Sequence, residues 1–298
     1  ALCMERQTHE PAAPPTRTSG SSAVAQPPQV TSYGLSDRGK KREQNEDQFL
    51  IAEISRAMQI VGSSLPQPAT AHSLPRVHVF AVADGMGGYH GGAHASAYAV
   101  KAIERFLLDT PRLSTVGAND QALPSEFQAA LTDADARLFA TGLARPELSG
   151  MGTTFTAAWY QESNLCVLHV GDSRCYLTRG PNLYQLTQDH TVVAELVRRG
   201  VITPQDAAHH SMRHVITNVV GGPSPGVRVE VHRTQIEAGD ALLLCSDGLT
   251  EMVPEATIRE VMTTERDPKA ACERLIKAAL DAGGRDNVTV VVARFDAA

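Results

Sequence analysis

The chain has 298 residues, of which 42% are hydrophobic, and its 27 basic and 33 acidic residues give a formal net charge of −6 at pH 7. A chain of this length can bury a substantial core, and its acidic balance argues against a nucleic-acid-binding surface. No apolar run approaches the roughly 18 residues of a membrane span, and no signal-peptide core is visible. The cysteines are scattered, odd in number and without a CxxC pair, which is typical of reduced thiols in a cytoplasmic protein. They are Cys3, Cys166, Cys175, Cys245 and Cys272.

In chain order, residues 1–30 come first and are rich in Pro, Ala, Ser and Thr without periodicity, so they are predicted to be a disordered tail or linker. Residues 62–75 are predicted to be an exposed hairpin loop. Strands are expected at 47–54, 77–83, 153–160, 165–170, 175–178, 227–232, 241–245 and 288–295. The strands are grouped and do not alternate strictly with helices, which favours an α+β domain over a doubly wound parallel sheet.

The helix signals are capping residues and apolar faces. Ser125 and Gln128 have the spacing of a capping box. Thr203 and Asp267 each precede a proline and are predicted to be N-caps, with the second of these helices ending at Gly283. Two helices show apolar faces, formed by Ala95, Ala99, Ala102, Ile103, Phe106 and Leu107 in the first, and by Phe127, Leu131, Ala134 and Leu138 in the second.

Acidic residues recur where apolar runs begin or end, beside Gly, Asn or Ser. They are Glu46 and Asp47 in "REQNEDQFLIAEI", Asp84 in "VFAVADGMGG", Asp172 in "LCVLHVGDSR", Asp247 in "ALLLCSDGLT" and Asp286 in "GGRDNVTVVV". One such acid is usually a turn former or a helix cap. Five segments of this kind suggest carboxylates that converge at the rim of a core, where they repel one another unless cations lie between them.

The type of ligand favours magnesium or manganese, because these hard cations prefer carboxylate oxygens and retain water. Histidine and cysteine residues lack the spacing of a zinc site. The five glycines that follow Asp84 within eight residues fit the same picture. A carboxylate can bridge two ions, and Gly85 can turn its carbonyl towards one of them because no Cβ blocks the approach. The later glycines are expected to keep the site open to a bulky substrate.

These segments together resemble the PPM-type (type 2C) metal-dependent Ser/Thr protein phosphatases in their bacterial form. The resemblance covers about residues 33–295, and the motifs occur in the family's order. They are "SDRGKKREQNED", "VADGMGG", "MGTTFTA", "HVGDSRCY", "LTQDHT", "LLLCSDGLTEMV" and "GGRDNVTVVV". The resemblance implies one catalytic domain over residues 31–298. Its expected fold is a four-layer α-β-β-α sandwich, with two central antiparallel sheets flanked by helices and the metal site at one end.

By this resemblance, Asp84 is expected to bridge two metal ions and Gly85 to bind one of them through its carbonyl. Asp247 and Asp286 are expected to bind the other ion. Asp47 is expected to bind the first, directly or through water, in preference to Glu46. Asp172 is similar to an acid that binds a third, weaker ion.

Arg42 is similar to the family's phosphate-holding arginine, and residues 187–222 match the variable flap beside the site. Met86 stands where eukaryotic members often carry a histidine proposed as general acid, which leaves the acid of this chain unidentified. Cys245 is expected to be a core thiol and no nucleophile. His190 is expected to cap a helix or line the flap.

The implied activity is hydrolysis of phosphoserine and phosphothreonine on proteins, by water that two metal ions activate, without a phosphoenzyme. The implied cofactors are two to three manganese or magnesium ions. The implied partners are phosphorylated proteins, including a bacterial Ser/Thr protein kinase whose products the enzyme would reverse.

Two alternatives remain. The first is a non-catalytic phosphatase-like sensor or binding module, which would be expected to have lost metal-binding acids. The second is a phosphatase for anti-sigma-factor antagonists, which would be expected to lose much of the "GDSR" and flap pattern.

Overall fold

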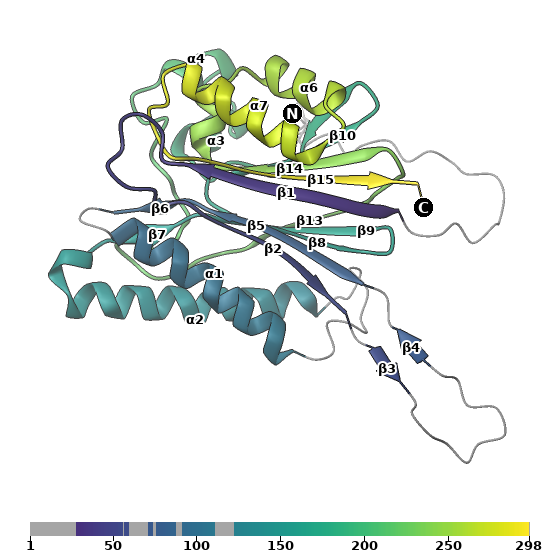
Figure 1. Ribbon diagram of the computed structural model, residues 1–298. Coiled ribbons are helices and arrows are strands. Elements are labelled where there is room, and N and C mark those ends of the chain that lie inside the picture. The colour runs from purple at the N-terminus through teal and green to yellow at the C-terminus, as the bar shows by residue number, and fades with distance from the viewer. Residues whose placement is uncertain are drawn as a thin grey trace, which may run out of the picture.

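The computed structural model describes residues 28–55, 57–59, 71–73, 76–87, 91–110 and 122–297. Two five-stranded antiparallel sheets pack face to face at its centre (Figure 1). In spatial order, the first contains β1 (Gln29–Asp37), β15 (Val288–Asp296), β14 (Asp240–Cys245), β10 (Arg174–Arg179) and β11 (Asn182–Gln185). The second contains β13 (Glu230–Gln235), β9 (Asn164–Val170), β8 (Phe155–Gln161), β5 (Val77–Ala83) and β2 (Gln48–Ile54).

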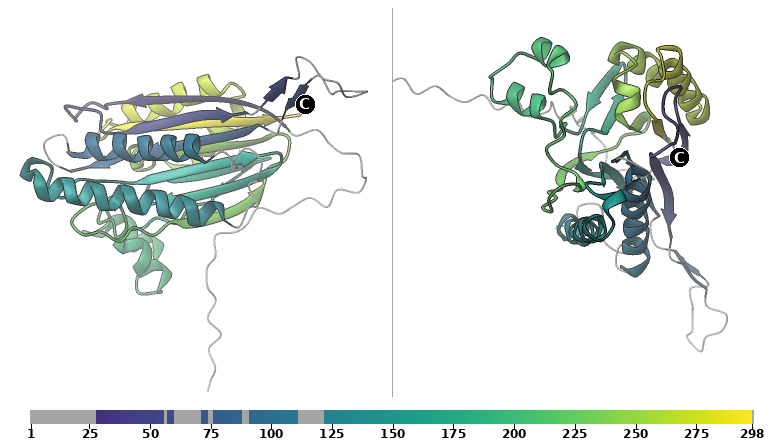
Figure 2. Two further views of the ribbon diagram at one scale, coloured as in Figure 1. Left: turned by 90° about the horizontal axis from the view of Figure 1, so that it is seen from below. Right: turned by 90° about the vertical axis from the view of Figure 1, so that its left-hand side faces the viewer.

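Helices cover the outer face of each sheet, so the molecule has four layers (Figures 1 and 2). The first sheet is covered by α6 (Glu255–Thr264) and α7 (Pro268–Asp281), and the second by α1 (Gly91–Asp109) and α2 (Leu123–Ala144). This arrangement confirms the expected α-β-β-α sandwich. The remaining helices are α3 (Val192–Arg198), α4 (Pro204–His209), α5 (Asp247–Thr250) and a short 3₁₀ helix, η2 (Pro146–Leu148).

The strand sequences are apolar on both faces because both faces are covered. In β5, Val79 and Ala81 belong to the core beneath α1 and α2, whereas Phe80 and Val82 lie in the core between the two sheets. Alternate residues of a strand point to opposite faces, so one apolar run serves two cores. A third core joins the first sheet to α6 and α7.

Shorter strands complete the fold. Next to the second sheet, β6 (Gly85–Met86), β7 (Gly152–Thr153) and β12 (Val220–Gly221) form a small sheet. The hairpin expected around residues 62–75 appears as a ladder between β3 (Ala57–Gln59) and β4 (Ala71–Ser73), in which Ala57 lies opposite Ser73. Residues 62–70 of the predicted loop lie outside the described residues. Within the described chain, no helix is long and apolar enough to cross a membrane.

Most predicted strands occur within two residues of their expected bounds, but one is divided and another is wrong. The strand expected at 153–160 is interrupted at Thr154, because residues 152–153 pair with β6 and β12 instead. The strand expected at 227–232 begins only at Glu230, because Val227 packs into the core beside α2. In addition, β1 begins at Gln29 and so includes two residues that were assigned to the N-terminal tail.

The helix predictions held except for one cap. Thr203 forms a capping box with Asp206, and Asp267 caps α7, which ends before Gly283. The box expected between Ser125 and Gln128 is absent from α2, whose N-cap is Ala122. The Gln128 side chain instead donates to Val227 O at 2.9 Å and accepts from Val229 N at 2.7 Å.

Candidate metal centre

Asp47 and Asp84 meet because β2 and β5 are antiparallel neighbours. The register pairs Gln48 with Ala83, so Asp47, which precedes β2, lies beside Asp84, which follows β5. Both side chains sit at the same end of the second sheet. The pairing of these two strands therefore brings together two acids that are far apart in the sequence.

The first sheet brings its acids to this same end. Cys245, the last residue of β14, pairs with Val290 of β15, so Asp247 and Asp286 flank this pair of strands. Asp172 lies in the turn that leads from β9 of one sheet to β10 of the other. A cavity of about 650 Å³ opens between the sheets here, and its lining includes Arg42, Asp84, Asp172, Asp247 and Asp286.

Burial and mutual repulsion strongly disfavour the charged form of these carboxylates. Burial, and then the charges of Asp47 and Asp247, raise the pKa of Asp84 well above its ordinary value. Burial raises the pKa of Asp47 to about 7, that of Asp172 to about 8 and that of Asp247 to about 6. Neighbouring carboxylates add to the rise in each case. Cations placed among them would remove this penalty.

The donor set fits a magnesium or manganese centre. Asp47 Oδ2 accepts a hydrogen bond from Ser246 Oγ at 2.8 Å, whereas Asp47 Oδ1 is buried and has no hydrogen-bond partner among the described residues. Within that same part of the chain, no three acidic, histidine or cysteine side chains are close enough together to hold an ion by themselves. The carboxylates instead surround a cavity, which suits cations that keep several water ligands.

Arg42 reaches the same cavity from the loop before β2. Its Nη2 donates to Asp286 Oδ2 at 2.6 Å, and this hydrogen bond is the main reason that the pKa of Arg42 is raised. The charges of Asp84 and Glu46 act in the same direction. The structure thus places a half-exposed guanidinium group directly beside the acidic cluster.

The glycines after Asp84 serve a close packing contact. A Cβ on Gly85 would lie 2.2 Å from Gly92 O, and one on Gly92 would lie 2.7 Å from Glu46 Oε2. Ser96 Oγ also donates to Glu46 O at 2.5 Å. The first turn of α1 is therefore pressed against the end of β5 and the loop before β2. This close contact requires glycine at positions 85 and 92. The sequence had suggested these glycines for metal access and substrate space.

A chain of hydroxyl groups, which the sequence analysis missed, fixes the backbone at Asp84. Thr154 N donates to Asp84 O at 2.9 Å, and Asp84 N donates to Thr154 Oγ1 at 2.9 Å. Thr154 Oγ1 is 2.8 Å from Ser173 Oγ, in the turn that carries Asp172. The "MGTTFTA" and "HVGDSRCY" motifs contain these residues, so their repeated hydroxyls were the available signal.

Asn287 is a second support that the sequence analysis did not single out. Its Nδ2 donates to Arg38 O and Gln44 O, both at 2.8 Å, and its Oδ1 accepts from Glu46 N at 2.8 Å. One amide side chain beside Asp286 thus holds the loop that carries Arg42. The "GGRDN" motif joins a site carboxylate to the residue that anchors this loop.

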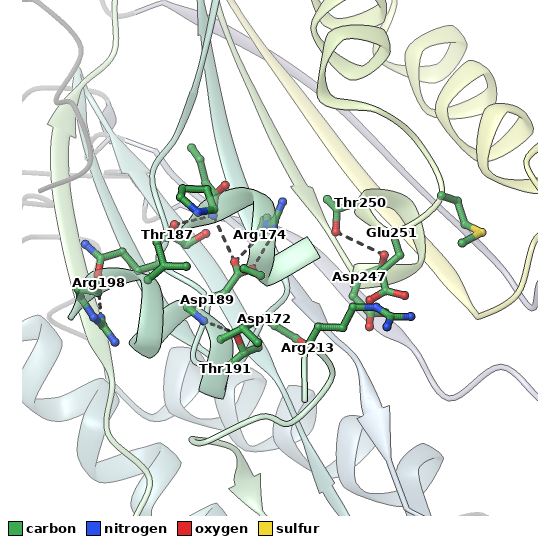
Figure 3. A pocket seen from close by; sticks show the side chains of 18 of the residues that line it. Asp172, Arg174, Thr187, Asp189, Thr191, Arg198, Arg213, Asp247, Thr250 and Glu251 are labelled. Atoms are coloured by element: carbon green, nitrogen blue, oxygen red, sulfur yellow. Dashed lines mark hydrogen bonds and ion pairs between the residues drawn. The ribbon is translucent and has the colours of Figure 1, made fainter. Parts of the chain in front are cut away.

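A second cavity of about 1,080 Å³ is lined in part by residues between 187 and 213, within the segment 187–222 that the sequence predicts to be the flap (Figure 3). Figure 3 shows Arg174 and Asp189 paired on one side and Asp247, Thr250 and Glu251 on the other. Arg174 Nη2 is 2.7 Å from Asp189 Oδ2, so a largely buried ion pair joins β10 to the start of the flap. Asp172 and Asp247 line both cavities, which makes the two spaces neighbours.

Comparison with known proteins decides the family. Residues 61–281 match the family model described as "Protein phosphatase 2C". The chain belongs to the protein phosphatase 2C family. It is a metal-dependent serine/threonine protein phosphatase of the bacterial type.

Similar members of this family come from several bacteria. The chain is 33% identical over 256 residues to the serine/threonine phosphatase stp of Listeria innocua, covering 86% of this chain and 92% of the relative. It is 39% identical over 215 residues to the serine/threonine protein phosphatase PstP of Mycobacterium tuberculosis, covering 72% of this chain and 40% of the relative.

Solved phosphatase structures share the fold. The catalytic domain of PstP in complex with two manganese ions has a TM-score of 0.69 at 33% identity, covering 90% of this chain and 98% of that one. A structure of the Streptococcus agalactiae serine/threonine phosphatase has a TM-score of 0.75 at 29% identity, covering 90% of this chain and 100% of that one.

Cys245 and His190 of this phosphatase both have surroundings that indicate a structural role. Cys245 is fully buried in β14, and burial raises the pKa of its thiol to about 12, so it is no nucleophile. His190 Nδ1 accepts from Gly171 N at 3.0 Å, and its Nε2 lies 3.3 Å from Glu230 Oε2. His190 thus ties the flap to the turn before Asp172.

Proposed function

We propose that this phosphatase holds its metal ions with the carboxylates of Asp47, Asp84, Asp172, Asp247 and Asp286, aided by the Gly85 carbonyl. What supports this assignment is that Asp84, Asp172, Asp247 and Asp286 line one cavity. Asp47 is buried beside Asp84 with one oxygen unpartnered among the described residues, and the pKa values of Asp47, Asp84, Asp172 and Asp247 are raised. Asp84 is the proposed bridging ligand, since it is partly buried at the cavity and lies within the charge of Asp47, Asp247 and Asp172. Asp172 is the proposed ligand of a third, weaker ion.

The side chains of the chain itself bind and orient the substrate. Arg42 holds phosphate oxygens with two parallel hydrogen bonds, as a guanidinium fork can. Bound manganese or magnesium would lower the pKa of a water molecule and neutralise charge on the phosphate, which would allow water to displace the serine or threonine oxygen without a phosphoenzyme. Thr154 and Asn287 keep Asp84 and the Arg42 loop in place during this step.

The substrates are proposed to be phosphorylated proteins, including those modified by a bacterial Ser/Thr protein kinase. A protein substrate would lie across the flap cavity, because this cavity adjoins the metal centre. The phosphatase domain would extend from β1 to β15, with residues 187–222 as its flap. A non-catalytic sensor is not favoured, since none of the metal-binding acids has been lost.

The deciding experiment is phosphate release from matched phosphoserine, phosphothreonine and phosphotyrosine peptides, with manganese and with excess chelator. We expect release from the first two peptides, only with the metal. Full activity in chelator after dialysis would contradict the metal centre, and a preference for phosphotyrosine would contradict the substrate class.

A further inference from the structure

His214 places an imidazole at the metal centre, and we propose that it is the general acid that protonates the leaving serine or threonine oxygen. His214 lines the cavity that contains Arg42, Asp84 and Asp286. Among the described residues that line this cavity, it is the one histidine. The inference rests on the phosphatase activity proposed above, and it assigns a role that Met86 cannot fill because a thioether carries no proton.

The His214 ring is oriented by a carboxylate from another element. Its Nδ1 lies 2.8 Å from Glu251 Oε1, and Glu251 follows directly after α5. A proton on Nδ1 satisfies this contact, which leaves Nε2 to face a substrate. A histidine held by a carboxylate through one nitrogen and reacting through the other is a common arrangement for acid–base catalysis.

The backbone around His214 is fixed to the rest of the flap. Val192 N donates to Val215 O at 2.9 Å, and Thr217 N donates to His190 O at 2.7 Å. Thr191 and Ile216 form an isolated antiparallel bridge between the same two segments. His214 therefore lies on a strap pinned to the start of α3, while its side chain is about half exposed, at 49%.

The other groups at the cavity are less suited to this role. The aspartates are the proposed metal ligands, and Arg42 stays protonated throughout. Glu46 is packed against Gly92. The charged and titratable groups around His214 are Glu251 and Asp247 from α5, His210 and Arg213 from its own segment, and Arg42, Glu46, Asp84, Asp172 and Asp286 across the cavity.

The step is balanced as follows. A water molecule attacks phosphorus and forms the new P–O bond, while the bond from phosphorus to the serine or threonine oxygen breaks. The leaving oxygen takes the proton from His214 Nε2 and departs as a hydroxyl group. His214 is left neutral. Inorganic phosphate, the second product, keeps the two hydrogens of the attacking water and releases one of them to solvent, from which the ring regains its proton.

The test is His214→Asn, assayed with manganese on two substrates. A phosphoserine peptide has a poor leaving group that needs a proton, whereas nitrophenyl phosphate releases a stable anion that does not. We expect kcat on the peptide to fall about 100-fold or more, and kcat on the aryl phosphate to stay within about two-fold. We also expect the unmutated chain to lose peptide turnover at alkaline pH, and this loss should disappear in the variant.

Two further variants control for structure. Glu251→Gln removes the charge that orients the ring and should give a smaller loss with the same dependence on the leaving group. His209→Asn replaces an exposed flap histidine outside both cavities and should change neither rate. An equal loss of kcat on both substrates in H214N would show that His214 only holds the flap in place, and would overturn the proposal. Unchanged peptide turnover, in an assay where the unmutated chain is active, would also overturn it.

Discussion

Arg42 and Asp286 are joined by an ion pair in which Nη2 and Oδ2 are 2.6 Å apart. The first residue is the proposed phosphate holder and the second a proposed metal ligand. Without a cation, Asp286 competes with phosphate for the same guanidinium group. A metal ion that binds the Asp286 oxygens would release Arg42 from this ion pair, so metal binding and phosphate binding should be coupled.

Arg42→Lys should lower kcat/KM for a phosphoserine peptide by roughly 10- to 150-fold, the equivalent of a charged hydrogen bond worth about 1.5–3 kcal/mol. Lysine keeps the charge but cannot form the two parallel bonds. Steady-state kinetics at saturating manganese measures the loss. Arg105→Lys is the control, because Arg105 pairs with Asp109 on the exposed surface of α1. Wild-type kinetics in the Arg42 variant would remove this residue from the phosphate site.

Asp84→Asn should abolish turnover and leave the protein folded. Asp84 is surrounded by other acids, so the neutral amide removes charge repulsion as well as a ligand. In chelator above neutral pH, the thermal midpoint should therefore be at or above that of the unmutated chain. Differential scanning fluorimetry checks this, with Asp133→Asn on the exposed face of α2 as the matched control. Retained turnover would show that Asp84 is not the bridging ligand.

The metal-free phosphatase should lose stability as pH rises. Folding raises the pKa of Asp247 to about 6, of Asp47 to about 7 and of Asp172 to about 8. Below the pKa of the unfolded chain, near ~4, these carboxyl groups contribute their full stabilisation. This stabilisation is lost as pH rises through the pKa values of the folded protein. Urea unfolding in chelator should show a free energy of unfolding that falls by a few kcal/mol between about pH 5 and 9.

Manganese should reverse this trend, since metal binding requires deprotonated carboxylates and releases protons. The stabilisation by manganese should be larger at pH 8 than at pH 6. Stability in chelator that does not change over this range would contradict the raised pKa values of the acids at the centre.

Asp172→Ala should separate the proposed third metal from the other two. Asp172 lies in the turn before β10 and lines both cavities, whereas Asp84 lines only the smaller one. We expect the tight phase of a calorimetric manganese titration to survive while turnover falls. Loss of the tight phase would place Asp172 in the main pair. Unchanged binding with unchanged turnover would leave it as a turn residue without a metal.

The sequence predicted the fold where local pattern and tertiary packing agree. The apolar run before Asp84 is β5 with its expected bounds, and Asp267 caps α7 as its spacing with Pro268 indicates. Prediction failed where a side chain forms its hydrogen bonds with a distant segment and not within its own element. Gln128 was expected to cap α2, but it binds the backbone at 227–229, and that contact displaces the start of β13.

The candidate site was predictable in its acids but not in its supports. Carboxylates after apolar runs are a visible pattern, whereas the meeting of Asp47 with Asp84 depends on the register of β2 and β5. The partners of Asn287 are distant in sequence, so no local pattern reveals them. His214 falls within the predicted flap with no motif to single it out, and only the fold shows the carboxylate beside it.

The position of β15 has a consequence for biosynthesis. This strand lies between β1 and β14, and Asn287 just before it fastens the early loop that carries Arg42. On the ribosome, the segments made first have no neighbour for β1 and no anchor for that loop until residues 286–296 have emerged. A nascent or prematurely terminated chain therefore carries most of the acids but no assembled catalyst. Phosphatase activity should appear abruptly once β15 has been translated, so incomplete chains should be inactive in the cell.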